Sequence, residues 1–409
     1  MERGRDRPAA PAPAAAAASA PAPLTPAQRI ACLRLIRSEN VGPVTYRELV
    51  AHFGDAGTAL DALPELSRRG GYRHPIRICP RDVAEAELEA ADRIGARPLI
   101  VGEPGYPEAL AAIDPPPPLL YVRGNPGLLV RPMLAIVGAR NGSAAGQKLA
   151  RQFAARLGSA GLVIVSGLAR GIDAAAHESA LATGTVAVLA GGPDNVYPPE
   201  HADLQRRIIE RGCLVTESPP GFAPRAQDFP RRNRIISGLA LGVLIVEAAR
   251  RSGTLVTARM AGEQGREVFA IPGHPLDPRA EGTNGLIKAG ATLVTELDDV
   301  LGALAPLLRE PLVGVRPTAS APAGADTAPP LPAQRPGPPA AGTVQPPLPG
   351  LLASDRDRLL DALGPAPVAV DELTRATGLP SRTIQIALLE LALAGRIERH
   401  GHHLVSLKG

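Results

Sequence analysis

Arginine and phenylalanine side chains are interleaved in one short segment, from Phe222 to Arg234. A guanidinium can pair with a phosphate and a phenyl ring can stack on a base, and proteins that hold single-stranded nucleic acid combine these two contacts. The alternative is a solvated loop whose Phe229 folds into the core. We favour the binding interpretation and predict a single-stranded DNA site. The residues predicted to form it in this segment are Arg225, Phe229, Arg231, Arg232, Asn233 and Arg234.

Two glycine-containing turns bring further arginines. One runs from Gly138 to Gly146 and the other from Ser166 to His177, and each follows an apolar run typical of a buried strand. Open parallel sheets bind anions where such strands end, because the next helix points free N–H groups outward there. We therefore expect both turns to contact phosphates, although glycine can also simply separate a strand from a helix. The residues concerned are Gly138, Arg140, Ser143, Ser166, Gly167 and Arg170.

The remaining polar candidates are Lys288, His177 and Asp173. We expect Lys288 to complete the positive cleft, although a lone lysine is usually just solvated. His177 could act as a base, but no nucleophile lies near it in the sequence, so a structural hydrogen bond is the favoured role. Asp173 fits the first turn of a helix, where a carboxylate is favourable.

Neither a cofactor nor a metal is expected. The first turn lacks the G-x-G-x-x-G spacing of a dinucleotide site, and no acidic residue follows the second strand to hold a ribose, which disfavours NAD. Cys32, Cys79 and Cys213 lie far apart, so their spacing supports neither a zinc site nor a disulfide framework. The three thiols are expected to be buried and reduced.

The turns must be positioned by a sheet. Between Leu134 and Leu308, short β-rich apolar runs alternate with helical stretches, which predicts a parallel sheet with helices on both faces. Most of these runs are continuously apolar, as strands buried on both faces must be. The expected strands span residues 134–138, 162–166, 185–189, 214–217, 243–247, 268–271 and 292–295.

Smaller domains are expected on either side of this Rossmann-like sheet. Apolar residues recur at helical spacing from Thr25 onward, which predicts a small helical domain of the SAM-like type. Near the C-terminus, three helices at 355–363, 370–377 and 381–394, followed by a hairpin at 396–406, predict a winged helix-turn-helix. The expected order is a disordered tail at 1–23, the helical domain at 24–97, the Rossmann-like domain at 98–310, a Pro- and Ala-rich linker at 311–350 and the winged helix at 351–409.

Composition and charge limit the classes of protein. The chain has 409 residues, too many for one ordinary core, and its net charge of +4 permits an anionic partner without demanding one. Aromatic residues make up only 2% of it, so aliphatic side chains must build the cores. No apolar run approaches the roughly 20 residues of a membrane helix, and residues 1–23 lack a compact apolar signal segment. We expect a cytoplasmic protein with no membrane partner.

Taken in order, these motifs resemble one family, the bacterial DNA-processing protein A (DprA/Smf) family. The segments that carry the resemblance include Ile136–Arg140, Ser166–Asp173, Phe229–Ile236, Ser252–Ala258 and Gly265–Gly273. The resemblance implies a Rossmann-like core that binds single-stranded DNA, forms a homodimer and helps load the recombinase RecA onto incoming strands during natural transformation. The DNA contacts that it implies fall on Arg140, residues 166–170, Phe229, Arg232, Arg234 and Lys288.

Two positions depart from the family pattern. The usual Gly-Ser-Arg is Gly138-Ala139-Arg140 here, which removes a hydroxyl. A lysine often found three residues before the Phe-Pro pair is replaced by Ala226, next to Arg225. We therefore expect the cleft to hold phosphate slightly differently.

A second candidate function is enzymatic. The expected fold is similar to that of nucleoside-monophosphate phosphoribohydrolases of the lysine-decarboxylase-like group, whose signature is a Pro-Gly-Gly-x-Gly-Thr-x-x-Glu loop. In the comparable stretch, residues 250–257, the position of the catalytic carboxylate is Thr257. Without that carboxylate, acid–base help to the leaving base is missing, although Glu217 and Glu247 remain at strand ends. We expect a binding protein and not an enzyme, with nucleotide hydrolysis as the alternative.

A third possibility makes the winged helix the main DNA-binding element. In its expected recognition helix, residues 381–394, Arg382 is the only basic residue and Glu390 offsets its charge. Such a helix cannot neutralise several phosphates. We expect this domain to contact protein, or to bind DNA only weakly.

Overall fold

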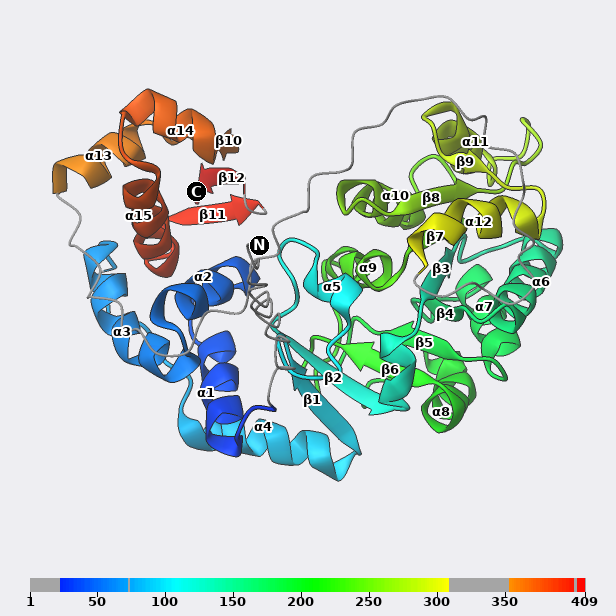
Figure 1. The fold of residues 1–409 in the computed structure, drawn as a ribbon, viewed down its shortest axis with the longest axis horizontal. Coiled ribbons are helices and arrows are strands. Elements are labelled where there is room, and N and C mark those ends of the chain that lie inside the picture. The colour runs from blue at the N-terminus through cyan, green and yellow to red at the C-terminus, as the bar shows by residue number, and fades with distance from the viewer. Residues whose placement is uncertain (1–22, 73, 309–352, 401–402, 409) are drawn as a thin grey trace, which may run out of the picture.

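The computed structural model describes residues 23–72, 74–308, 353–400 and 403–408. The predicted linker lies outside these ranges, as does the predicted tail apart from its last residue. Figure 1 shows a large α/β part, a helical part formed by the N-terminal segment, and a smaller C-terminal part that lies beside the N-terminal helices. The described residues therefore group into three packed units.

Nine strands form one sheet within the described α/β part, in the order β1-β2-β6-β5-β4-β3-β7-β8-β9. The seven strands from β6 to β9 in this order are parallel, as expected for apolar runs buried between two helical layers. All seven strands expected from the sequence are confirmed, with ends that differ by one or two residues. The strands are β1 Ala96–Ile100, β2 Leu119–Gly124, β3 Met133–Val137, β4 Val163–Ser166, β5 Thr185–Val188, β6 Cys213–Thr216, β7 Gly242–Ile245, β8 Glu267–Ala270 and β9 Thr292–Leu293.

β1 and β2 extend the sheet beyond the predicted parallel core. β2 runs antiparallel to both β1 and β6, so the complete sheet is mixed. Arg97 and Pro98 interrupt the apolar pattern of β1, which therefore gives only a weak strand signal. β1 also crosses the expected boundary between the helical and Rossmann-like domains, and that boundary stays a prediction.

Helices cover both faces of the sheet. Along β3, Leu134 and Ile136 pack with α6, α7 and α12, whereas Ala135 and Val137 pack with α5, α9 and α10. This alternation follows from the two-residue period of a strand. The Rossmann-like α/β fold class expected from the sequence is confirmed. The helices are α5 Glu108–Ala111, α6 Ala144–Ser159, α7 Ile172–Ala180, α8 Ala202–Arg211, α9 Asp228–Leu239, α10 Gly253–Glu263, α11 Glu281–Lys288 and α12 Leu297–Leu304, with short 3-10 helices at Pro126–Val130, Pro199–His201 and Ala305–Leu307.

The N-terminal unit is a helical domain, as expected. Its first helix begins after Thr25, whose side chain and that of Gln28 each accept a hydrogen bond from the other residue's backbone N–H. Leu35, Leu49 and Leu63 are completely buried in its core. The helices are α1 Pro26–Arg37, α2 Pro43–Phe53, α3 Ala56–Arg69 and α4 Arg81–Arg93.

The C-terminal unit is a winged helix. The three expected helices and the closing hairpin are all present, and a short third strand gives a small sheet in the order β10-β12-β11. Leu359, Leu373 and Leu391 are completely buried in its core. The elements are α13 Ala353–Asp361, β10 Val368–Ala369, α14 Val370–Thr377, α15 Ser381–Leu393, β11 Ile397–His400 and β12 Leu404–Leu407.

The three cysteines are free and buried, which confirms the expectation for their side chains. Burial raises the pKa of the Cys213 thiol to about 12, so this sulfur stays protonated and unreactive. Over the described ranges, no helix is both long and apolar enough to span a bilayer.

Candidate nucleic-acid interface

Loops at the carboxyl ends of the parallel strands enclose a groove. Two cavities of about 360 and 750 Å³ lie there and have part of their walls in common. The topology brings these loops together, because the carboxyl ends of parallel strands meet at one edge of the sheet. We call this region the strand-end groove and define it by the residues that line both cavities: Arg140, Ala169, Tyr197, Pro224, Phe229 and Arg232.

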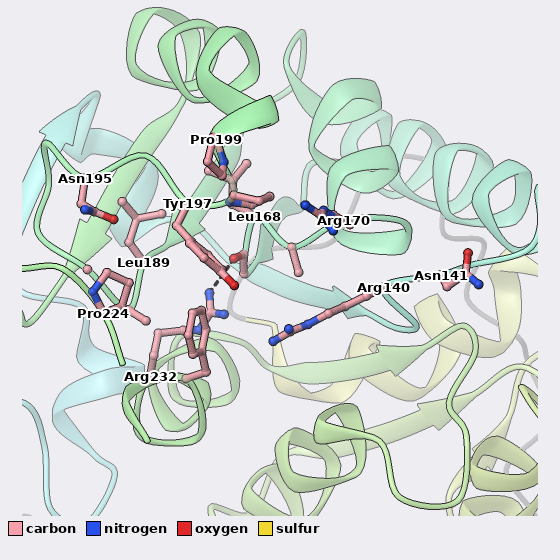
Figure 2. Close-up of a pocket in the computed structure, with 16 residues that line it drawn as sticks. Arg140, Asn141, Leu168, Arg170, Leu189, Asn195, Tyr197, Pro199, Pro224 and Arg232 are labelled. Atoms are coloured by element: carbon pink, nitrogen blue, oxygen red, sulfur yellow. Dashed lines mark hydrogen bonds between the residues drawn. The ribbon is translucent and has the colours of Figure 1, made fainter. Parts of the chain in front are cut away.

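An aromatic pair and an arginine form the centre of the strand-end groove. The ring centroids of Tyr197 and Phe229 lie 5.1 Å apart, with the rings tilted by 51°. The guanidinium carbon of Arg140 lies 5.5 Å from the centroid of the Phe229 ring, which is within cation–π range. Figure 2 shows Arg140, Tyr197 and Arg232 pointing toward the same space. The groove therefore places a positive charge beside a surface on which bases can stack.

Close packing fixes the two arginine-bearing turns against each other. A Cβ added to Gly138 would lie 2.6 Å from the Ile172 side chain, and one added to Gly171 would lie 2.5 Å from the Ala139 carbonyl oxygen. Gly171 also has a φ of +75°, in the left-handed region that favours glycine. Larger residues at these positions would force the β3–α6 and β4–α7 turns apart. The glycines thus set the spacing of the groove wall.

Arg140 and Arg170 are the exposed cations of the smaller cavity. Arg140 has no carboxylate partner among the residues that the structure describes. Arg170 pairs with Glu200, but the two side chains are 62% and 46% exposed. Exposed ion pairs contribute little net stability, so a phosphate can replace Glu200 at small cost. Both arginines are positioned to accept an anionic ligand.

Arg232 is more buried than we expected for a residue that contacts DNA. The residue is only 6% exposed, and its Nη1 donates to the carbonyl oxygens of Gly167 and Val188. Burial lowers the pKa of Arg232 to about 10, while the buried carboxylate of Asp173 acts in the opposite direction. The predicted pairing of Arg232 with phosphate therefore has little support in this arrangement, although the residue lines both cavities. Arg232 forms the floor of the strand-end groove and supports the β4–α7 turn.

α7 carries two buried polar residues, of which Asp173 also lines the larger cavity. His177 is completely buried, and its Nδ1 lies 2.7 Å from the Thr185 hydroxyl oxygen. Burial lowers the pKa of His177 to about 3, so the imidazole is neutral near pH 7. Asp173, in the first turn of α7, accepts the backbone N–H groups of Gly167 and Ala169. The structural roles expected for His177 and Asp173 are confirmed by these contacts.

The other polar residues of α9 point in different directions. Arg234 donates from Nη1 to the Pro115 carbonyl oxygen at 2.8 Å and pairs through Nη2 with Glu217. Its side chain is 14% exposed, which corrects its prediction as a phosphate ligand, because its donors already brace a loop. Arg231 is exposed and lines separate cavities next to Glu217. Asn233 lines the larger cavity of the groove.

The remaining predicted contacts are helix caps, buried groups or distant residues. Ser143 caps α6, where its hydroxyl oxygen accepts a backbone N–H at 2.9 Å. Ser166 is completely buried and donates to the Ile136 carbonyl oxygen at 2.6 Å, so its hydroxyl does not face the groove. Lys288 and Arg225 are exposed but line neither cavity. The predicted residues that do line the two cavities are Gly138, Arg140, Gly167, Arg170, Phe229, Arg232 and Asn233.

Among the wall residues that were not predicted, one aromatic and one exposed arginine are suited to contact nucleic acid. Tyr197 follows β5 and is 46% exposed, and the exposed Arg251 follows β7 and lines the larger cavity. Tyr197 could have been found, because the chain has only five tyrosines and this one lies shortly after a predicted strand. Arg251 carried no such signal, since it lies outside the Phe- and Arg-rich segment.

Both strand-end carboxylates serve structural contacts. Glu217 pairs with Arg234, and Glu247 accepts the backbone N–H of Ser143 at 2.9 Å as well as its hydroxyl. Thr257 is 2% exposed within α10. Across the described part of the chain, no three His, Cys, Asp or Glu side chains gather in a way that could hold a metal ion. The two carboxylates are therefore occupied by partners in this arrangement.

Three protein-family models match the chain. The model described as DNA recombination-mediator protein A matches residues 97–305, which is half of the chain and includes the whole strand-end groove. The DprA-like N-terminal HHH domain matches residues 26–90. The DprA winged helix domain matches residues 332–402.

Individual relatives are similar over most of their own length. Protein Smf from Escherichia coli is 42% identical over 295 residues, which cover 71% of this chain and 72% of that protein. DNA processing protein DprA from Streptococcus pneumoniae is 46% identical over 198 residues, which cover 48% and 70%. The X-ray structure of DprA from Streptococcus pneumoniae superposes with a TM-score of 0.57 and 35% identity, covering 68% of this chain and 98% of that one.

Proposed function

Because this chain belongs to the DNA recombination-mediator protein A (DprA/Smf) family, we propose that it is a DNA-processing protein whose strand-end groove binds single-stranded DNA. The observation that carries this proposal is the cluster of Arg140, Tyr197 and Phe229. A cation next to two aromatic rings suits an unpaired strand, which offers both phosphates and base faces. A duplex hides its base faces by stacking them.

Each wall of the groove has a distinct role in this proposal. Arg140 and Arg170 pair with phosphates, and Tyr197 and Phe229 stack on bases. Arg232 keeps the floor in place and adds positive potential from below. None of these contacts depends on base identity, so the sequence preference is weak. Exposed residues outside the two cavities can extend the contact along a longer strand: Arg225, Arg231 and Lys288.

Membership of the family also suggests the cellular process in which the bound DNA strand is used. We propose that the protein acts in the cytoplasm as a homodimer, protects incoming single strands during natural transformation and loads RecA recombinase onto them. The Streptococcus pneumoniae relative is named a DNA processing protein, and three family models of DNA recombination-mediator protein A and DprA match this chain. Light scattering after size-exclusion chromatography tests the dimer, and a monomer at micromolar concentration would contradict it.

We propose binding without catalysis. Glu217 and Glu247, the strand-end carboxylates, have structural partners, and Thr257 stands where a phosphoribohydrolase carries its catalytic carboxylate. Glu217 and Glu247 are therefore not free to give acid–base help to a leaving base or to stabilise a ribosyl cation. Chromatographic detection of free base after incubation with nucleoside monophosphates tests the alternative, and enzyme-dependent release would favour hydrolysis.

The single-strand preference is tested directly by fluorescence anisotropy with single-stranded and duplex oligonucleotides of the same length. We expect tighter binding to the single strand, with similar affinities for homopolymeric and mixed sequences. Equal affinity for the duplex would contradict the groove as the principal site.

A further inference from the structure

The C-terminal part of α15 is buried on every side, whereas its first turn is exposed. From Ile386 to Ala394 every residue is buried, whereas a helix at a protein surface normally keeps a polar face in water. Two separate cores account for this burial. Ile384, Leu388 and Leu391 pack in the core of the winged helix itself. Ile386, Leu389 and Leu393, spaced as one helical face, pack in the core of the N-terminal helices.

The backbones of the two units approach closely at this second face. A Cβ added to Gly70, directly after α3, would lie 2.0 Å from the Glu390 carbonyl oxygen. The Asn40 side-chain amide donates to the Leu393 carbonyl oxygen at 3.0 Å. Figure 1 shows α15 next to α2 and α3. The two units are therefore in direct backbone contact along this face.

Two ion pairs lie at or beside the contact, and some of their buried polar atoms make no hydrogen bond. Arg399, on β11, pairs with Glu48 of α2 across the contact, and the Arg399 side chain is only 9% exposed. Glu390 is completely buried and lies 3.5 Å from Arg356. Burial raises the pKa of Glu390, and the positive charge of Arg356 opposes this rise. Separating the two units would expose the apolar face of α15 and break the Arg399–Glu48 pair.

α15 is the helix that a winged helix normally offers to DNA. In helix-turn-helix folds the second helix of the motif lies in the major groove, with its N-terminal residues at the base edges. In α15 that first turn is exposed and carries one cation, Arg382. α15 has this place in the motif, but its outer face consists of Ile386, Leu389 and Leu393 and is covered by protein. Arg382 is the only basic residue of α15. Neither the chemistry nor the accessibility of this face suits a DNA duplex.

We propose that α15 is an interdomain docking helix. Through its outer face the winged helix binds the N-terminal helical domain of this chain, and it therefore does not bind duplex DNA through α15. The inference does not depend on the strand-end groove, which shares none of the residues of this contact. Its two consequences are that the contact persists in solution and that duplex DNA does not compete for it.

Two adjacent leucines provide a matched pair of variants in the full-length chain. Leu389 faces the N-terminal domain and Leu388 faces the core of the winged helix, and they are 4% and 1% exposed. For Leu389→Ala we expect backbone amides of α2, α3 and α15 to exchange hydrogen roughly tenfold faster or more, while α13 and α14 keep their protection. For Leu388→Ala we expect α13 and α14 to lose protection. Hydrogen-exchange mass spectrometry measures both.

Gly70→Ala tests the same contact without removing any packing. Gly70 has helical backbone angles that alanine adopts readily, so the added methyl acts only as a wedge against α15. Gly42→Ala is the control, because no atom lies within 4 Å of its added Cβ. We expect Gly70→Ala to speed exchange of α15 and the control to leave it unchanged. If Gly70→Ala and Leu389→Ala both exchanged hydrogen in α2, α3 and α15 at the same rates as the wild-type chain, the docked arrangement would be overturned.

A duplex oligonucleotide tests the second consequence. We expect no added protection of α15 when duplex DNA is mixed with the wild-type chain, and unchanged duplex affinity in Arg382→Ala. Protection of α15 by duplex, together with a tenfold or larger loss of duplex affinity in Arg382→Ala, would show that α15 binds DNA and would overturn the proposal.

Discussion

The strand-end groove and the outer face of α15 belong to two folds that both serve nucleic-acid binding in other proteins, yet they present opposite chemistry. In the groove, Arg140 and Tyr197 are exposed around a cavity. On α15, Leu389 and its apolar neighbours are buried against another domain. DNA binding needs accessible cations, whereas an apolar face needs a protein partner. Accessible charge, and not the name of a fold, therefore decides which surface we assign to DNA.

The largest effect should separate the buried arginine of α9 from its exposed neighbour. Arg232→Ala would remove the hydrogen bonds from the buried guanidinium to the Gly167 and Val188 carbonyl oxygens, and hydrogen bonds to a charged group contribute about 1.5–3 kcal/mol each. Arg231→Ala removes an exposed side chain and should change the free energy of unfolding by less than about 0.5 kcal/mol. Urea unfolding of both variants measures the difference. Equal, small changes would show that Arg232 does not brace the groove floor.

An intermediate effect should come from the aromatic pair. Phe229→Ala removes a stacking face and should weaken single-strand binding by about 1–3 kcal/mol, with an unaltered salt dependence because no charge is lost. Tyr197→Phe keeps the second ring and removes only a hydroxyl, so its affinity should match that of the wild type. Anisotropy titrations at several salt concentrations check both. If Phe229→Ala bound the single strand with wild-type affinity, the bases would not stack on Phe229.

The smallest effect should follow removal of the winged helix. The strand-end groove lies wholly within residues 23–308, so deletion of residues 309–409 should change single-strand affinity by less than about threefold, or roughly 0.7 kcal/mol. The same deletion uncovers α2 and α3, whose amides should exchange faster. A hundredfold loss of affinity, about 2.7 kcal/mol, would instead move the principal site to the C-terminal domain.

Much of the fold could be predicted, because buried strands and helices carry recognisable patterns of apolar residues along the sequence. The parallel strands are continuous apolar runs, as in Val163–Ser166, and each was expected within one or two residues of its ends. β1 was not predicted, because Arg97 and Pro98 break its apolar pattern. Antiparallel pairing with β2 holds this segment in the sheet despite its weak strand signal. The pattern also indicated a helix at residues 381–394. It could not show which domain covers the outer face of that helix.

The candidate site was predictable in composition but not in detail. The Arg- and Phe-rich segment does supply Phe229 to the groove, and both glycine turns supply an exposed arginine. However, an arginine in sequence is expected at the surface, because burial of its charge is costly without a partner. Arg232 donates to the carbonyl oxygens of Gly167 and Val188, far away in the chain, and Arg234 pairs with Glu217 on another loop. Such long-range pairs are invisible to local patterns.

The most direct test of the central claim is the salt dependence of single-strand binding in Arg140→Ala, with Arg234→Ala as the matched comparison. If Arg140 pairs with a phosphate, its loss should flatten the plot of log K against log salt by roughly 0.7 without lowering the melting temperature. Arg234→Ala should instead lower the melting temperature and leave the slope of the folded protein unchanged. An unaltered slope in Arg140→Ala would contradict the assignment of the strand-end groove to DNA.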